Sequence, residues 1–273
     1  MFVTIIKVSN LGSDKMLLAI DVGNTHITLG VYNNDELINN WRMATDKDKT
    51  ADEIGVLVLN MFKYSDIDVK KIDDVIISSV VPPIMYSLCH AMQKYLGIDP
   101  IVVDNTVKSE LKIKCDNPKE VGADRIVNAI GAINLYKAPM VIVDFGTATT
   151  FCVINENKEY LGGAILPGIK ISMSALFEKT AKLPRIEIAK PKNVIGRNTV
   201  DSMQSGVYYG YVGSVDYTVE KIKEELKCSD LTVIATGGLA RMISEDSKAI
   251  THIDSKLTLK GLNIIYKSMK EEK

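Results

Sequence analysis

Two aspartates stand at the ends of apolar runs, and each is followed by a glycine and a small polar residue. Asp21-Val-Gly-Asn-Thr25 follows the run 16–20, and Asp144-Phe-Gly-Thr-Ala148 follows 141–143. Glycine lets a backbone approach an anion closely, and the amides of a turn form an anion-binding concavity. A strand-end aspartate can hold a cation or its water shell, because Mg²⁺ prefers oxygen ligands and keeps several waters. The pattern predicts two hairpins whose tips grip phosphate.

The surroundings of the two tips match as well. Each tip lies between an apolar run and a second strand, and a polar turn at 33–36 or 155–158 leads to a third strand. Two such copies suggest two related half-molecules. An ordinary hairpin turn is the alternative for either copy alone. Neither G-x-x-x-x-G-K-[ST] nor G-x-G-x-x-G occurs in the sequence, so the P-loop and Rossmann types of phosphate site are not supported.

A third candidate site is the start of the helix predicted from Gly122 to about Tyr136. Helix-start amides and the positive end of the dipole suit anionic groups, so Asp124 there is expected to keep a low pKa. For Asp124 taken alone, a stabilising charge in the first helical turn is the favoured alternative. The glycine turn at 236–238 is a plausible seat for the base or ribose of a nucleotide, and a plain strand–helix turn is the alternative.

The elements that must position these residues follow a strand–helix–strand rhythm, which predicts an α/β sheet with covering helices. A capping box at Thr50–Glu53 opens an amphipathic helix to about Tyr64. Glycines 206, 210 and 213 lie within a long helix that Asn198 or Thr199 can cap. They indicate close packing, either in the core or against a second subunit. The other predicted elements are strands at 75–81, 101–104 and 231–238 and a helix at 84–96.

Composition narrows the class of protein. The chain has 273 residues, and 33 basic against 34 acidic residues leave a net charge of -1, so nucleic acid is not an expected partner. No apolar run reaches the ~20 residues that a membrane span needs. The four cysteines are scattered and the three histidines form no zinc motif, which favours a reducing compartment, the cytoplasm. Residues 1–15 are taken as a leader outside the fold.

Taken in order, the motifs resemble those of the type III pantothenate kinases, members of the actin, hexokinase and Hsp70 superfamily. The resemblance runs from Met16 nearly to the end, through Leu257-Thr-Leu-Lys-Gly-Leu262. It implies an α/β fold of two related ribonuclease H-like (actin-like ATPase) domains, 16–119 and 120–273, with a central interdomain cleft. Its motifs are D-V-G-N-T at 21–25, S-S-V-V-P at 78–82, N-P-x-E-x-G-A-D-R at 117–125, D-x-G-T-A at 144–148, G-G-A-I-x-P-G at 162–168, G-R-N-T at 196–199 and T-G-G at 236–238.

The resemblance also implies an activity, which is ATP-dependent phosphorylation of pantothenate to 4′-phosphopantothenate, the entry step of coenzyme A synthesis. It implies a homodimer that needs a monovalent cation, K⁺ or ammonium, besides ATP with Mg²⁺. Asp124 would be the catalytic base, Asp144 would hold the monovalent cation, and Asp21 would organise Mg²⁺ through water. ATP would contact Thr147 and the loop Asp21, Val22, Gly23, Asn24, Thr25, His26, Ile27 and Thr28, and pantothenate would contact Gly122, Ala123, Asp124, Arg125 and Thr199.

One position departs from the family pattern. Members commonly carry a substrate-contacting tyrosine two residues before the Asn-Pro pair, where this chain has Cys115. A thiol does not reproduce the stacking area and hydroxyl donor of a phenol, which puts substrate affinity in question. Two other functions stay open, namely a kinase of the same superfamily acting on a sugar or carboxylic acid, and a non-catalytic regulatory homologue.

Overall fold

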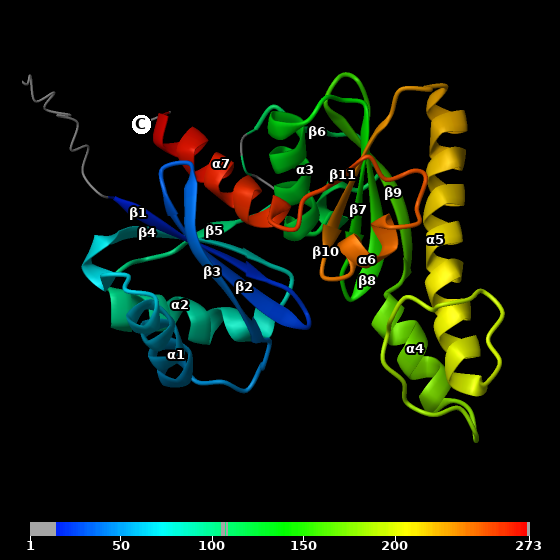
Figure 1. Ribbon diagram of the computed structural model, residues 1–273. Coiled ribbons are helices and arrows are strands. Elements are labelled where there is room, and N and C mark those ends of the chain that lie inside the picture. The colour runs from blue at the N-terminus through cyan, green and yellow to red at the C-terminus, as the bar shows by residue number, and fades with distance from the viewer. Residues whose placement is uncertain (1–14, 105–106, 108, 272–273) are drawn as a thin grey trace, which may run out of the picture. The chain divides into compact units, whose positions relative to one another are not determined.

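The computed structural model describes residues 15–104, 107 and 109–271 (Figure 1). The chain divides into two compact units between Val102 and Val103. The boundary expected at 119–120 stays a prediction about domains, and nearly all of the expected leader lies outside the described residues. Within the described part of the chain, no helix has the length and apolar character needed to cross a bilayer.

The first unit is a five-stranded sheet with two helices on one face. Strands β1 and β2 form the antiparallel hairpin predicted around the first tip, and β4 runs parallel to β1. The sheet order is β3-β2-β1-β4-β5. The elements are β1 (Met16–Val22), β2 (His26–Asn33), β3 (Glu36–Ala44), α1 (Ala51–Tyr64), the short 3-10 helix η1 (Val69–Lys71), β4 (Ile72–Ser79), α2 (Pro82–Leu96) and β5 (Ile101–Val103).

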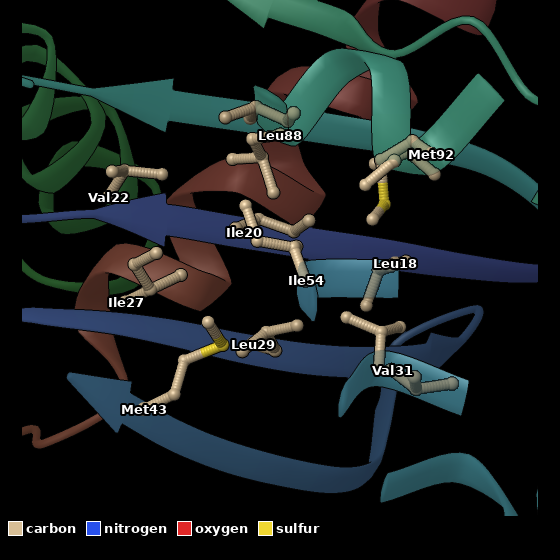
Figure 2. Packing of buried hydrophobic residues seen from close by; sticks show 14 of the residues in the cluster. Leu18, Ile20, Val22, Ile27, Leu29, Val31, Met43, Ile54, Leu88 and Met92 are labelled. Atoms are coloured by element: carbon tan, nitrogen blue, oxygen red, sulfur yellow. The ribbon is translucent and has the colours of Figure 1, made fainter. Parts of the chain in front are cut away.

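Local sequence accounts for both helices of this unit. The predicted capping box of α1 is present, with the Glu53 amide donating to Thr50 Oγ1 and the Thr50 amide donating to Glu53 Oε2. Helix α2 begins at Pro82, where the missing N–H costs no hydrogen bond. Figure 2 shows their apolar faces meeting the sheet, with Ile54 of α1 and Leu88 of α2 against Leu18 and Ile20 of β1. This core makes β1 a rigid support for the tip that follows it.

The second unit is a six-stranded sheet of order β11-β10-β7-β8-β9-β6. Helices α4, α5 and α6 pack on one face through a core that contains Val141, Val143 and Phe145 of β7. The elements are β6 (Lys112–Ile113), the 3-10 helix η2 (Pro118–Glu120), α3 (Ala123–Leu135), β7 (Met140–Phe145), β8 (Ala148–Ile154), β9 (Glu159–Pro167), α4 (Ile169–Glu178), α5 (Thr199–Leu226), β10 (Thr232–Gly237), α6 (Ala240–Ser244), β11 (His252–Ile253) and α7 (Leu257–Glu271).

The duplication predicted from the sequence extends to strand topology. Read as β9-β8-β7-β10-β11, five strands of the second sheet repeat the order β3-β2-β1-β4-β5 of the first. In both sheets the strand before the tip pairs antiparallel with the next strand and parallel with the fourth. The strand ends at Ser78–Ser79 and Thr236–Gly237 therefore occupy equivalent places, so the fourth strand belongs to the repeat.

Glycines have opposite roles in two helical regions of the second unit. Helices α3 and α7 cross in close contact, because a Cβ on Gly131 would lie 3.1 Å from the Gly261 Cα atom. In α5, by contrast, a Cβ on Gly206, Gly210 or Gly213 would meet nothing within 4 Å in the described residues. Of the two alternatives for these three glycines, packing in the core of the same chain is therefore wrong, since they lie on an exposed face of α5.

Candidate active site

Each strand-end aspartate lies between two hydroxyl residues of its sheet. Asp21 is in register with Thr28 of β2 and Ser78 of β4. Asp144 is in register with Thr150 of β8 and Thr236 of β10. Residues in register on neighbouring strands share a face, so both carboxylates stand among hydroxyl groups. The Ser78 Oγ atom is buried and has no hydrogen-bond partner among the described residues.

The first tip is an open turn that β3 holds in place. The Gly23 amide donates to the His26 carbonyl at 3.0 Å, and Asn24 and Thr25 at its apex are exposed. Thr45, directly after β3, donates its hydroxyl to the Gly23 carbonyl at 2.6 Å and its amide to the Thr25 carbonyl at 3.0 Å. This role of Thr45 was not predicted from the sequence, because the residue lies 20 positions after the motif and no glycine or other turn residue of a motif stands beside it.

The second tip is shorter and more crowded. Three residues, 146–148, separate the paired Phe145 and Thr149, whereas four separate the corresponding residues of the first tip. The Gly146 amide donates to the Ala148 carbonyl at 3.1 Å. Gly168, directly after β9, contacts this tip so closely that a Cβ there would lie 2.7 Å from the Gly146 carbonyl oxygen. Gly168, the last glycine of the G-G-A-I-x-P-G motif, therefore permits a close backbone contact with the tip.

Asp124 lies in the first turn of α3 as expected, but its pKa differs from the expectation. Its Oδ1 accepts a hydrogen bond from the Arg125 amide at 2.8 Å. That bond and the Arg125 charge both lower the pKa, yet desolvation by burial outweighs them and raises it above the ordinary value. The low pKa expected for this helix-start aspartate is therefore wrong. The sequence shows the local donors that lower the pKa, but it does not show the burial that raises it.

Asp144 lies near Asp124 in the second unit, and burial raises its pKa as well. Desolvation, followed by the negative charge of Asp124, raises the pKa of Asp144 to about 6. Asn128, one turn after Asp124 on α3, donates Nδ2 to Asp144 Oδ2 at 3.4 Å. On the other side, a Cβ on Gly237 would lie only 2.6 Å from Asp144 Oδ1. The fold thus brings two carboxylates together, and one of them borders a space that only glycine leaves open.

This cradle suits a cation. A cation prefers hard oxygen ligands, and Asp144 Oδ1 lies beside Gly146 and Gly237, which have no side chain that would crowd it. A nearby positive charge would also relieve the repulsion between the carboxylates of Asp124 and Asp144. Among the described residues there is no cluster of three or more histidine, cysteine or acidic side chains able to hold a metal. Any cation here must therefore depend on carbonyl oxygens, hydroxyl groups and water as well.

Arg125 faces a buried pair of side chains from β8 and β9. The Tyr160 hydroxyl donates to Cys152 Sγ at 3.5 Å. Burial raises the pKa of the Cys152 thiol to about 11, and the positive charge of Arg125 acts in the opposite direction. Cys115 follows Lys114, whose amide donates to the Tyr160 carbonyl at 2.8 Å. The position of the family tyrosine therefore lies beside the strand that carries Tyr160.

Some predicted contact residues have limited access to a ligand. The side chains of Val22 and Ile27 are buried in the core of the first unit, so only their backbone groups can contact a ligand. Thr199 is exposed at the first residue of α5, where Asn198 is the N-cap. A hollow of about 410 Å³ lies beside the T-G-G turn, lined by Lys170, Met173, Ser174, Phe177, Arg185, Ile186, Glu187, Ile188 and Leu239.

Comparison with known proteins places these features in context. The model of the family described as type III pantothenate kinase matches residues 17–221. A solved protein from Campylobacter jejuni, described as a Baf family transcriptional activator, is 18% identical, with a TM-score of 0.60 over 93% of this chain and 99% of that one. One from Sinorhizobium meliloti, described as a 2-dehydro-3-deoxygalactonokinase, is 10% identical, with a TM-score of 0.58 over 93% and 96%. At these identities the two structures show a shared fold only.

Proposed function

This chain belongs to the type III pantothenate kinase family and is a kinase, and from that premise we propose that it phosphorylates pantothenate with ATP to give 4′-phosphopantothenate for coenzyme A synthesis. The observation that carries the proposal is that the carboxylates of Asp124 and Asp144 lie close enough in the second unit for the charge of Asp124 to raise the pKa of Asp144. One carboxylate lies at a helix start suited to an anionic substrate, and the other borders a cradle suited to a cation. We also propose that the reaction takes place in the cytoplasm.

ATP and a divalent metal are the general requirements of a kinase, and the chain offers groups for both. The exposed residues Asn24 and Thr25 and the amides of the first tip would bind phosphate oxygens, and Asp21 would hold Mg²⁺ through water. Thr147 of the second tip would contact ATP. The hollow beside Leu239 is of a size typical for ligand pockets and would receive the nucleoside. Bound Mg²⁺ and K⁺ would supply charge neutralisation at the phosphates.

Asp124 has the environment of a base that acts late in the reaction. Phosphoryl transfer passes through a loose transition state, so positioning and charge neutralisation supply most of the acceleration. In such a reaction the acceptor alcohol keeps its proton until near the end. A carboxylate whose pKa is raised by burial accepts that proton more readily than an ordinary aspartate. Asp124 would orient the alcohol and then take its proton.

The acceptor would lie against the start of α3. Gly122, Ala123 and Arg125 surround Asp124 there, and Gly122 is the N-cap without a side-chain cap bond. Pantothenate carries a carboxylate, which a guanidinium group such as that of Arg125 binds in a two-bonded geometry. Thr199 would contribute a further polar contact to pantothenate.

The test is an assay of ADP release with pantothenate, run with and without K⁺, beside a panel of sugar and carboxylic acid acceptors. We expect pantothenate to be the preferred acceptor. Asp124→Asn should lower kcat by about 10²–10⁴-fold, the usual contribution of a positioned acid–base group, with an unchanged circular dichroism spectrum. Asp116→Asn, a change of an exposed carboxylate eight residues earlier, is the matched control. Preference for another acceptor, or near-normal turnover of Asp124→Asn, would contradict the proposal.

A homodimer is the second part of the proposal, and α5 supports it. Gly206, Gly210, Gly213 and the exposed Tyr217 recur every three or four residues, so they form one stripe along the helix. Bare glycines let a second helix approach closely, which explains their presence in a helix that they destabilise. Gly210→Glu should convert a dimer into a monomer in light scattering. Glu225→Gln, at an exposed position of α5 that lies off this stripe, should leave the dimer intact.

A further inference from the structure

Helix α7 carries the motif Leu257-Thr-Leu-Lys-Gly-Leu262, to which the proposed reaction gives no role. Gly261 in this motif brings the α7 backbone onto α3, because a Cβ there would lie 2.9 Å from Val127 Cγ1 and 3.0 Å from the Val127 carbonyl carbon. Gly131 gives the same freedom from the side of α3. Thr258 lies one turn before Gly261, and Asn128 lies one turn before Gly131, so the crossing sets these two polar residues against each other.

Their contact fixes the orientation of the Asn128 amide. The Thr258 hydroxyl donates to Asn128 Oδ1 at 2.7 Å. Since the carbonyl oxygen of the amide is held by that donor, the Nδ2 group must point the other way, and there it donates to Asp144 Oδ2 at 3.4 Å. Asn128 is only 3% exposed, so water does not compete freely for either end of the amide.

The other carboxylate oxygen of Asp144, Oδ1, lies on the side away from Asn128, next to glycine backbone. Asp144 Oδ1 borders Gly237 and Gly146, where a Cβ would lie 2.6 Å and 3.6 Å away. A carboxylate with one oxygen held by an amide donor and the other beside bare backbone has a single preferred orientation. Such outer contacts orient ligating carboxylates in metal sites in the same way.

We propose that Thr258 and Asn128 are positioning residues, which hold the carboxylate of Asp144 so that Oδ1 faces the glycine-bordered cradle and is available to a monovalent cation. The inference rests on the proposed function for the identity of the cation. It assigns to the C-terminal helix a part in the site, although neither residue touches substrate.

Thr258→Val removes the hydroxyl at nearly constant volume, and the amide of Asn128 is then free to turn.

The experiment uses the full chain and measures K⁺ in two ways. The first is the K⁺ concentration that gives half-maximal activity, and the second is the rise in thermal midpoint that K⁺ produces in the presence of Mg·ADP without an acceptor. We expect Thr258→Val to raise the half-maximal K⁺ concentration about 10-fold, as loss of an outer contact commonly weakens metal binding 10–100-fold. The K⁺-dependent rise in midpoint should fall in parallel, and Thr258→Ser should restore both.

Thr232→Val is the matched control. Its hydroxyl donates to the Lys137 carbonyl at 2.8 Å, and it pairs with Met140 at the opposite end of β7 from Asp144. This variant should lose comparable stability and keep the K⁺ response of the wild type. An equal K⁺ response in Thr258→Val and wild type would overturn the proposal, as would a wild type whose nucleotide complex ignores K⁺. If the wild type responds to K⁺ but does not phosphorylate pantothenate, only the proposed acceptor is wrong, and the same comparison on Mg·ADP still decides the positioning role.

Discussion

Gly237→Ala should destabilise the second unit and displace Asp144 at the same time. The residue has φ +90°, a conformation that costs an L-amino acid about 1–2 kcal/mol. A Cβ would also lie 2.6 Å from Asp144 Oδ1 and 2.7 Å from the Phe145 backbone nitrogen. Forcing close-packed atoms apart typically costs about 1–3 kcal/mol. The two effects together predict a loss of about 2–5 kcal/mol in the free energy of unfolding.

Gly162→Ala separates the two contributions within the same unit. Gly162 on β9 has φ +122°, but a Cβ there would meet nothing within 4 Å. It should therefore lose only the conformational part, about 1–2 kcal/mol. Urea denaturation at 25 °C, followed by circular dichroism, measures both variants against wild type, and calorimetry with Mg·ADP reports the nucleotide site. If Gly237→Ala matched Gly162→Ala in stability and bound Mg·ADP as wild type does, the crowding argument would be refuted.

Two further predictions concern single side chains. Cys115→Tyr should restore the phenol common in the family and lower KM for pantothenate about 3–10-fold, in line with the worth of one aromatic contact, and an unchanged KM would show that Cys115 lies away from the acceptor. Asp246 is held by Lys190 and the Tyr208 hydroxyl at 2.9 and 2.8 Å, which lower its pKa. Because the folded-state pKa is the lower one, this stabilisation is present above the ordinary pKa and is lost as the pH falls. The stability difference between wild type and Asp246→Asn should therefore shrink between about pH 5 and pH 3, and a constant difference would contradict the assignment.

The elements that local sequence encodes were predictable. The capping box at Thr50 and Glu53 marks the start of α1, and Asn198 caps α5 through the Asp201 amide. The strands beside the first tip were also predictable, because a short apolar run ends at Asp21 and Ile27, Leu29 and Val31 then alternate with other residues. The family model match confirms the type III pantothenate kinase assignment made from the ordered motifs.

Features that depend on distant parts of the chain were not predictable in this way. The hydroxyl of Thr258 meets Asn128 across 130 residues, and neither residue type signals the contact. The pKa of Asp124 depends on burial among elements that the helix-start pattern does not specify. The glycines of α5 are a further example. Small residues on a helix predict close packing, but they do not show whether the packing partner lies in the same chain or in a second one.

The repeat also bears on the proposal that the two copies of the hairpin bind different ligands. The residue after the third strand is Thr45 in the first copy and Gly168 in the second, and the residue at the end of the fourth strand is Ser79 or Gly237. In the first copy a hydroxyl fastens a four-residue tip whose apex stays exposed, which suits phosphate oxygens. In the second copy the two glycines let backbone close in on a three-residue tip and on Asp144. A side chain at Gly237 would occupy the place beside Asp144 Oδ1, so the two glycines support the proposal that this copy binds a single ion rather than a phosphate chain.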